Sequence, residues 1–424
     1  MRKSLSILAG AAALGLALTG CSTGGGTPDP GNADQVEVFT WWASGSEKVG
    51  LDALVKVFNE QYPDVEFINA SVAGGAGSNA KAALASRLEA NDPPDTFQAH
   101  AGAELTDYIN AGQLQDLSSF YAETGLNDVF PASLLERLTV DGAIYSVPSN
   151  IHRANVVWVN TAVLTDAGID PTKAPADMDA WIKDLQKLKD AGVETPLSLG
   201  TEWTQMQLLE NVLIADLGAD GYSGLWTGDT SWDSAGVKKA VDHYGQLLGF
   251  VNSDFAGLEW DAATQIVIDG NAGYNVMGDW AEAAFVQAGK IYGTDYTTWA
   301  TPGTDGVFDF LADSFTLTVG APHEQATKDW LTTISSAEGQ KAFNIAKGSI
   351  PARTDAVASD YPAYQQTAIK SFAEDTVVSS LAHGAAASIS WSGDISSAVG
   401  KFGADRDAAS LVGALVAAAA KALG

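Results

Sequence analysis

The sequence predicts an α/β protein built from two domains or two large lobes. Short apolar, β-branched runs alternate with segments of helical periodicity along most of the chain, a pattern typical of a largely parallel sheet covered by helices. The chain has 424 residues, more than one hydrophobic core usually holds. Pro148 interrupts two apolar runs, and this break predicts the first passage of the chain between the lobes.

The folded part is predicted to begin with a buried strand that leads into a tryptophan pair. Val36, Val38 and Phe39 form an apolar run, which is typical of a parallel strand buried on both faces. Trp41 and Trp42 follow at its carboxyl end, the edge where doubly wound sheets bind ligands. A flat indole ring suits the C–H face of a sugar. Either one ring faces a cleft while the other packs in the core, or both lie in the core.

The first half of the chain is predicted to alternate helices with strands. Leu51, Leu54 and Phe58 recur at helical spacing, and Pro63 ends that helix. The glycine-rich Ala73–Gly77 turns the chain but lacks the Gly-x-Gly-x-x-Gly pattern of a dinucleotide site. The other elements expected in this half are strands at 65–72, 95–99, 144–147 and 154–159 and helices at 80–90 and 104–111.

The second half is richer in helical patterns. Asp177 is the predicted N-cap of a helix that runs to Ala191 and repeats Trp181, Leu185 and Leu188 on one face. Two further passages between the lobes are expected near 299–302 and 347–353. The other predicted elements are helices at 204–217, 234–248, 261–269, 323–335, 337–346, 361–372 and 406–423 and strands at 272–277 and 314–319.

The N-terminus has the organisation of a secretory signal peptide. Charged Met1–Lys3 precedes the apolar run Leu5–Leu18, which is short for a membrane span. The following Leu-Thr-Gly-Cys21 resembles a bacterial lipobox, which implies cleavage after residue 20 and a lipid on the Cys21 sulfur. Residues 21–34 then form the lipidated cysteine and a flexible tether. We expect the mature protein on the outer face of the cytoplasmic membrane; an ordinary signal peptide is the alternative.

The composition excludes several classes of partner. The formal net charge is −29, and such a surface repels nucleic acids and anionic lipids. Cys21 is the single cysteine, so no intramolecular disulfide can form. Hydrophobic residues make up 46% of the chain, enough for sizeable cores.

Motifs of catalysis are not recognised in the sequence. His323-Glu324 lacks the second histidine of the zinc-protease motif, and no Walker-type phosphate loop occurs. The Gly-x-Ser-x-Gly match at Gly20–Gly24 overlaps the lipobox and carries no weight. Polar and aromatic residues instead gather beside the predicted passages between lobes, in a combination suited to hydroxyl groups and sugar rings. They are Gln98, His100, Asn150, His152, Trp203, Trp260, Asp279, Asp313, Lys347 and His383.

Nine segments, in order along nearly the whole mature chain, carry a resemblance to a known family. They are Val38–Trp42 with Glu47, Ala73–Gly77, Pro93–Gly102, Val147–Arg153, Leu199–Gln205, Asn275–Trp280, Asp313–Phe315, Lys347–Ile350 and Leu381–Gly384. Together they resemble the extracellular solute-binding lipoproteins of ABC sugar importers, in the maltodextrin-type class. The Gln-x-His, Asn-Ile-His-Arg and Leu-x-His-Gly segments are most similar to the glucose-binding branch.

The resemblance implies a two-lobed, periplasmic-binding-protein-like fold with interlobe crossing segments and a ligand cleft. Lobe 1 is expected at 35–149 plus 301–348, and lobe 2 at 150–300 plus 349–424. Trp42 would stack on one face of a pyranose and Trp260 would close the other. The residues implied to hold the hydroxyls are Glu47, Gln98, His100, Asp313, Lys347 and His383, with Trp41, Asn150, Trp203 and Asp279 close to the cleft.

The function implied is binding without chemistry, and it needs neither a cofactor nor a metal. A monomeric protein would capture a monosaccharide, with glucose first and galactose or mannose next, close around it, and deliver it to the transmembrane subunits of an ABC permease. One alternative is a binder of oligosaccharides or another polar solute. Another is a secreted glycoside hydrolase, which requires two carboxylates about 5–9 Å apart.

Overall fold

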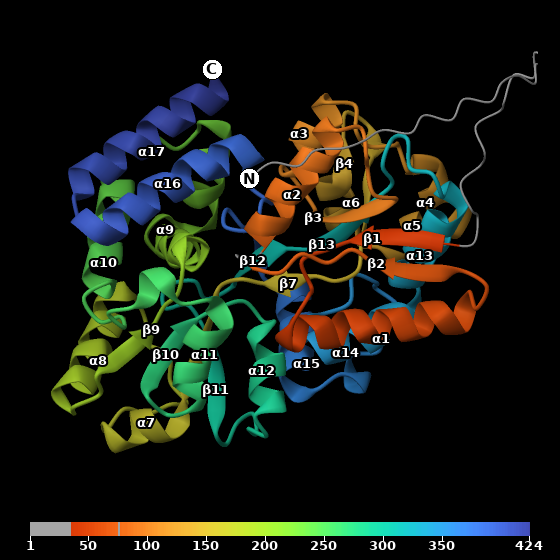
Figure 1. Ribbon diagram of the computed structural model, residues 1–424. Coiled ribbons are helices and arrows are strands. Elements are labelled where there is room, and N and C mark those ends of the chain that lie inside the picture. The colour runs from red at the N-terminus through yellow and green to blue at the C-terminus, as the bar shows by residue number, and fades with distance from the viewer. Residues whose placement is uncertain (1–34, 75–76) are drawn as a thin grey trace, which may run out of the picture.

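The computed structural model describes residues 35–74 and 77–424. The predicted signal peptide at 1–20, Cys21 and the tether at 21–34 lie outside the described residues. Among the helices that are described, none combines the length and the apolar character needed to cross a membrane. Figure 1 shows two groups of helices and strands side by side, with β7 and β12 running between them.

The first sheet has five strands in the order β2-β1-β3-β13-β6. They are β1 (Gln35–Phe39), β2 (Glu66–Asn69), β3 (Thr96–His100), β6 (Ser146–Pro148) and β13 (Asp313–Thr316). Strand β1 lies parallel to β2 and β3, whereas β13 runs antiparallel to β3 and β6. The register places Asp313 opposite His100, so two predicted site residues become neighbours although they are far apart in the sequence.

The second sheet has four strands in the order β11-β8-β10-β9. They are β8 (Val156–Asn160), β9 (Thr195–Ser198), β10 (Ala272–Val276) and β11 (Tyr296–Ala300). Every residue of β8 and β10 is buried, as expected for inner strands covered by helices on both faces. A separate hairpin joins β4 (Thr139–Val140) to β5 (Ala143–Ile144).

A third sheet connects the other two, and we call it the crossing sheet. It orders β14 (Thr376–Ser379), β12 (Val307–Leu311) and β7 (His152–Arg153). The chain passes from β6 through β7 to β8, returns from β11 through β12 to β13, and passes a third time through β14. The predicted two-lobed α/β fold with crossing segments is confirmed.

In the described part of the chain, six helices precede the first passage, and three later helices join this group. Helix α1 packs along α13 and α14, and Figure 1 shows the three together beside β1 and β2. The early helices are α1 (Gly45–Gln61), α2 (Ser78–Glu89), α3 (Leu105–Asn110), α4 (Ser118–Thr124), α5 (Leu126–Val129) and α6 (Ala132–Leu138). The later ones are α13 (Glu324–Ser335), α14 (Ala337–Lys347) and α15 (Ala363–Glu374).

The remaining helices surround the second sheet. They are α7 (Thr161–Asp166), α8 (Met178–Asp190), α9 (Glu202–Thr227), α10 (Ala235–Leu247), α11 (Trp260–Ile268), α12 (Ala281–Gln287), α16 (Ile389–Asp405) and α17 (Ala408–Leu423). Asp177 caps α8 as predicted, because its Oδ1 accepts a hydrogen bond from Ala180 N at 2.8 Å. The helix predicted at 204–217 bends at Gly218 (φ 70°) and then continues to Thr227.

Two hydrophobic clusters form the core. One lies behind the second sheet and includes Trp181 of α8 and Leu411 and Leu415 of α17. The other contains Trp41 and Trp42 of the first group of elements together with Trp203, Trp260 and Trp280 from elements around the second sheet. The two groups of elements therefore meet in one continuous apolar cluster, and the cavity described next lies within it.

Candidate ligand-binding site

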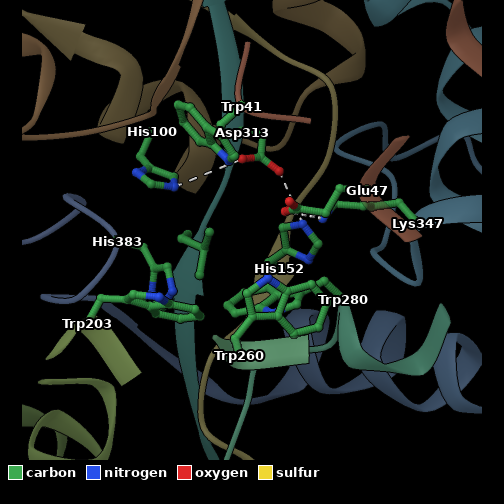
Figure 2. Close-up of a pocket in the computed structure, with 11 residues that line it drawn as sticks. Trp41, Glu47, His100, His152, Trp203, Trp260, Trp280, Asp313, Lys347 and His383 are labelled. Atoms are coloured by element: carbon green, nitrogen blue, oxygen red, sulfur yellow. Dashed lines mark hydrogen bonds and ion pairs between the residues drawn. The ribbon is translucent and has the colours of Figure 1, made fainter. Parts of the chain in front are cut away.

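A cavity of about 330 Å³, measured with the part that opens to solvent, lies between the two groups of elements. Figure 2 shows its side chains converging from several elements. The residues that line it are Trp41, Glu47, His100, His152, Trp203, Trp260, Trp280, Leu311, Asp313, Lys347 and His383.

Four tryptophans line the cavity. Trp41 follows β1 on the side of the first sheet, whereas Trp260 begins α11, Trp203 lies in the first turn of α9 and Trp280 precedes α12. Figure 2 shows Trp41 across the cavity from the other three. Flat indole faces on opposite walls can enclose the C–H faces of a ring.

Asp313 is the polar centre of the cavity. Its Oδ1 accepts a hydrogen bond from Gln98 Nε2 at 2.9 Å, and its Oδ2 accepts one from Asn150 Nδ2 at 2.8 Å. Burial alone would raise the pKa of Asp313, but the hydrogen bond and charge of His152 and the charge of Lys347 outweigh it and hold this pKa well below its usual value. The carboxylate is therefore ionised and fixed in orientation.

His152 is held between two carboxylates. Its Nδ1 contacts Asp279 Oδ1, and its Nε2 lies 3.1 Å from Asp313 Oδ2. Complete burial lowers the pKa of His152, but Asp279 and Asp313 outweigh this effect and raise it above its ordinary value. The imidazole is thus stabilised in its charged form, and both of its nitrogens already have partners.

Two further polar contacts border the cavity. Lys347, the last residue of α14, places Nζ 3.1 Å from Glu47 Oε1. His100 Nδ1 lies 2.8 Å from Glu104 Oε2, which also accepts from Lys81 Nζ at 2.8 Å. Burial raises the pKa of Glu104, but Lys81 and His100 outweigh it and lower this pKa to about 2. Charges of both signs therefore face the same small space.

The structure brings eight of the predicted site residues to the cavity. Three others, Gln98, Asn150 and Asp279, lie behind it. Gln98 and Asn150 hold Asp313, and Asp279 holds His152. The eight that line it are Trp41, Glu47, His100, Trp203, Trp260, Asp313, Lys347 and His383.

Trp42 does not line the cavity, which corrects the expected division between the two tryptophans. Its ring is fully buried, with centroid distances of 5.5 Å to Phe315 and 4.7 Å to Phe343. Thr40 Oγ1 accepts a hydrogen bond from Trp42 N at 3.2 Å and donates one to Gln98. This turn ends the strand alternation, directing Trp42 into the core and leaving Trp41 beside the ligand space.

Three lining residues were not among those that the family resemblance assigned to the site. His152 and Trp280 belong to the Asn-Ile-His-Arg and Gly-Asp-Trp segments, and these two motifs were the available signal. Leu311 ends β12, a strand that the sequence analysis did not predict. The described residues contain no cluster of His, Cys, Asp and Glu side chains suited to holding a metal ion.

Two α/β lobes joined by crossing strands around an enclosed polar and aromatic cavity define an extracytoplasmic solute-binding protein. A family model described as "Bacterial extracellular solute-binding protein" matches residues 42–341. The chain belongs to this family, so the predictions of family and of a binding protein rather than an enzyme are confirmed. The lipid on Cys21 stays a prediction.

Relatives cover nearly the whole chain. An uncharacterised ABC transporter extracellular-binding protein of Pyrococcus horikoshii is 36% identical over 410 residues, covering 95% of this chain and 92% of the relative. A probable sugar-binding periplasmic protein of Rhizobium meliloti is 34% identical and covers 83% of this chain and 85% of the relative. A solved chitin oligosaccharide binding protein has a TM-score of 0.80 at 21% identity, covering 92% of this chain and 98% of that one; at this identity the likeness concerns the fold.

Proposed function

We propose that the protein captures a monosaccharide in this cavity and delivers it to an ABC permease. Glucose is the first candidate, followed by galactose and mannose. The observation that carries the proposal is the pairing of Trp41 with Trp260 across a cavity of about 330 Å³ that also holds Asp313, Lys347 and His383. The name of the Rhizobium meliloti relative supports a sugar as the class of solute.

Each polar group has a distinct part in the proposed recognition. Ionised Asp313 accepts a hydrogen bond from one hydroxyl through the remaining lone pair of Oδ1, as carboxylates do in strong charge-assisted bonds. The Lys347 ammonium donates to a second hydroxyl, and Glu47 accepts. The indoles of Trp41 and Trp260 cover the two faces of the ring. No atom of the sugar changes its bonds in this scheme.

Binding is proposed to close the protein. Lobe 1 is assigned to 35–149 plus 301–348, and lobe 2 to 150–300 plus 349–424. A sugar that touches both lobes binds the closed form more tightly and shifts the population toward it. The closed protein, a monomer tethered through the lipid on Cys21, is then the form that the permease transmembrane subunits recognise.

A neighbouring cavity favours an oligosaccharide as the second candidate. It encloses about 650 Å³ and shares Trp41, Glu47 and Trp260 with the first, extending to Ser44 and Asp261. A second sugar unit could continue past the Trp41–Trp260 pair into this space. The two candidates therefore differ in whether a ligand extends beyond that pair.

Isothermal titration calorimetry with glucose, galactose, mannose, xylose and maltose tests the proposal. Tight binding of one monosaccharide, weakened at least about 100-fold by Trp260→Ala and by His383→Ala, would support it. His243→Ala is the matched control, since His243 is equally buried but bonds Asp216 outside the cavity. Binding of maltose alone would favour the oligosaccharide, and no heat with any of the five sugars would contradict the proposed class of ligand.

A further inference from the structure

Three histidines line the cavity, and the partner of Nδ1 in one of them differs in kind from the partners in the other two. His152 and His100 meet the carboxylates of Asp279 and Glu104. His383 Nδ1 instead lies 2.9 Å from the hydroxyl of Ser380. A carboxylate can only accept from an imidazole, whereas a hydroxyl can either donate or accept. The tautomer of His383 therefore depends on what lies behind Ser380.

Glu210 is the group behind Ser380. Ser380 Oγ lies 3.0 Å from Glu210 Oε1 and 3.1 Å from Oε2, and Glu210 Oε2 also accepts a hydrogen bond from Ala382 N at 2.8 Å. Glu210 and Ser380 are both fully buried. Neither lines the cavity, so both can act on a ligand only through His383.

A second buried carboxyl group sits against Glu210. Asp309, in the middle of β12, is fully buried. Burial and the proximity of Glu210 raise the pKa of Asp309 well above its usual value, and burial also raises that of Glu210. The Asp309 carboxyl group meets no N–H or O–H donor among the described residues, and the charge of Arg153 only partly offsets the rise in its pKa. Glu210 accepts from Ala382 and Ser380.

Glu210 has N–H and O–H donors and Asp309 has none. This contrast indicates which of the two carboxyl groups carries their shared proton. Asp309 carries it and donates to Glu210, because ionised Asp309 would have no hydrogen bond to compensate its burial. Glu210 is then the ionised partner, and an ionised carboxylate only accepts. The single hydroxyl proton of Ser380 must point to Glu210, so its lone pair faces His383 and accepts from Nδ1–H.

The other nitrogen of His383 faces the ligand space. The ring is only 4% exposed, it lines the cavity, and its Nε2 has no hydrogen-bond partner among the described residues. Figure 2 shows it beside Trp203, and its ring centroid lies 5.8 Å from that of His100. Burial, together with the charges of His100 and His152, lowers the pKa of His383 well below its ordinary value, which keeps the ring neutral.

We propose that Glu210, acting through Ser380, fixes His383 as the Nδ1–H tautomer, so that Nε2 accepts a hydrogen bond from a ligand hydroxyl. Glu210 and Ser380 are positioning residues. The statement about the ligand rests on the proposed sugar-binding function, whereas the statement about the tautomer does not. An acceptor at Nε2 requires a free hydroxyl on the sugar at that point and rejects an ether or a glycosidic oxygen there.

The tautomer is measured by NMR of the protein labelled with ¹⁵N-histidine, without any ligand. The wild-type protein is expected to show His383 protonated at Nδ1 and unprotonated at Nε2. In Glu210→Gln the amide oxygen keeps the Ala382 N–H and the amide nitrogen donates to Ser380, so Ser380 now donates to Nδ1. The expected result is a reversal, with the proton on Nε2.

Two further variants complete the measurement. Ser380→Ala removes the partner of Nδ1 and is expected to give a mixture of tautomers. Ser335→Ala, which removes a buried hydroxyl bonded to Leu331 O in α13, should leave the His383 signals unchanged. Wild-type protein protonated at Nε2 would overturn the proposal without any variant, and so would an unchanged tautomer in folded Glu210→Gln.

The ligand part is tested with monofluorinated glucose derivatives, each lacking a different hydroxyl. Fluorine cannot donate a hydrogen bond, so one derivative should bind the wild-type protein about tenfold more weakly than glucose. That loss should shrink to less than about threefold in Glu210→Gln, whose Nε2–H now donates. Equal losses in both proteins would overturn the ligand part. Failure of glucose to bind would count against the proposed function while leaving the tautomer result intact.

Discussion

The two kinds of cavity wall differ in where their residues originate. Three of the polar residues come from the crossing sheet or closely follow it: His152 lies in β7, Asp313 begins β13 one residue after β12, and His383 follows β14. The tryptophans come from helices and loops on either side. Polar groups tied by several hydrogen bonds are fixed before a ligand arrives, whereas the aromatic walls contribute mainly apolar area. The polar groups of the crossing sheet and the aromatic rings that enclose the cavity therefore come from different parts of the fold.

Replacement of Asp313 is expected to have the largest effect, because it removes a group that several polar residues of the cavity share. Asp313→Ala removes the acceptor of Gln98 and Asn150 and leaves the charged ring of His152 with one carboxylate. We expect the free energy of unfolding to fall by about 3–5 kcal/mol and sugar binding to be lost. Urea denaturation and calorimetry measure both. Asp394→Ala, at an exposed pair with Lys421, should change neither, and unaltered sugar affinity in Asp313→Ala would contradict the polar centre.

Substitution of the two adjacent tryptophans, one at a time, distinguishes a ring that encloses the ligand from a ring that packs in the core. Trp41→Ala should weaken sugar binding by about 10- to 100-fold, because it removes one wall of the cavity. Trp42→Ala should instead lower the free energy of unfolding by about 3–5 kcal/mol, because its ring fills the core between Phe315 and Phe343. The same two measurements apply. A stable Trp42→Ala protein that had lost its affinity would reverse the assignment.

The pH dependence of the free energy of unfolding measures how much the ionised carboxylate of Glu104, which bonds His100, stabilises the fold. The pKa of Glu104 is lowered in the folded protein from 4.5 to about 2, so its ionisation stabilises the fold above pH 4.5. This contribution, about 3 kcal/mol, is lost as the pH falls through about 2. Glu104→Gln should remove that part of the slope in urea unfolding measured at decreasing pH. A slope equal to that of the wild-type protein would mean that other carboxylates cause it.

An exposed ion pair provides the smallest expected effect. Lys48 and Asp52 of α1 lie 2.6 Å apart, with side chains 47% and 57% exposed. Lys48→Ala should change the free energy of unfolding by no more than about 0.5 kcal/mol, without altering sugar affinity. Urea denaturation at low and high salt checks this. A loss above about 1 kcal/mol would show that this exposed pair contributes more to stability than exposed ion pairs usually do.

Much of the fold could be predicted from periodicity. The strand at Val36–Phe39, the helix capped by Asp177 and the C-terminal helix all show clear patterns. Strand β12 was missed, although all five of its residues are buried. Asp309 lies in the middle of it, and a carboxylate there argues against a buried strand unless its partner Glu210 is known.

Site residues could be predicted where a sequence motif contains them. They could not be predicted where the packing of neighbouring side chains determines which residue faces the cavity. Family-like segments led to Asp313, Lys347 and His383, which line the cavity. Which of Trp41 and Trp42 faces the cavity depends on the turn at Thr40 that ends the strand. The spacing of residues in the sequence does not reveal that turn. The partners of His152 likewise come from segments more than 100 residues away.

The position of Asp313 next to the crossing sheet has a mechanical consequence. Ala312 alone separates it from β12, a strand of the crossing sheet that joins the two groups of elements. In the closure proposed above, groups beside these strands would move least, because the strands are common to both lobes. The contact between His152 and Asp313 would then persist in an open molecule, and closure would chiefly bring the indole rings over it.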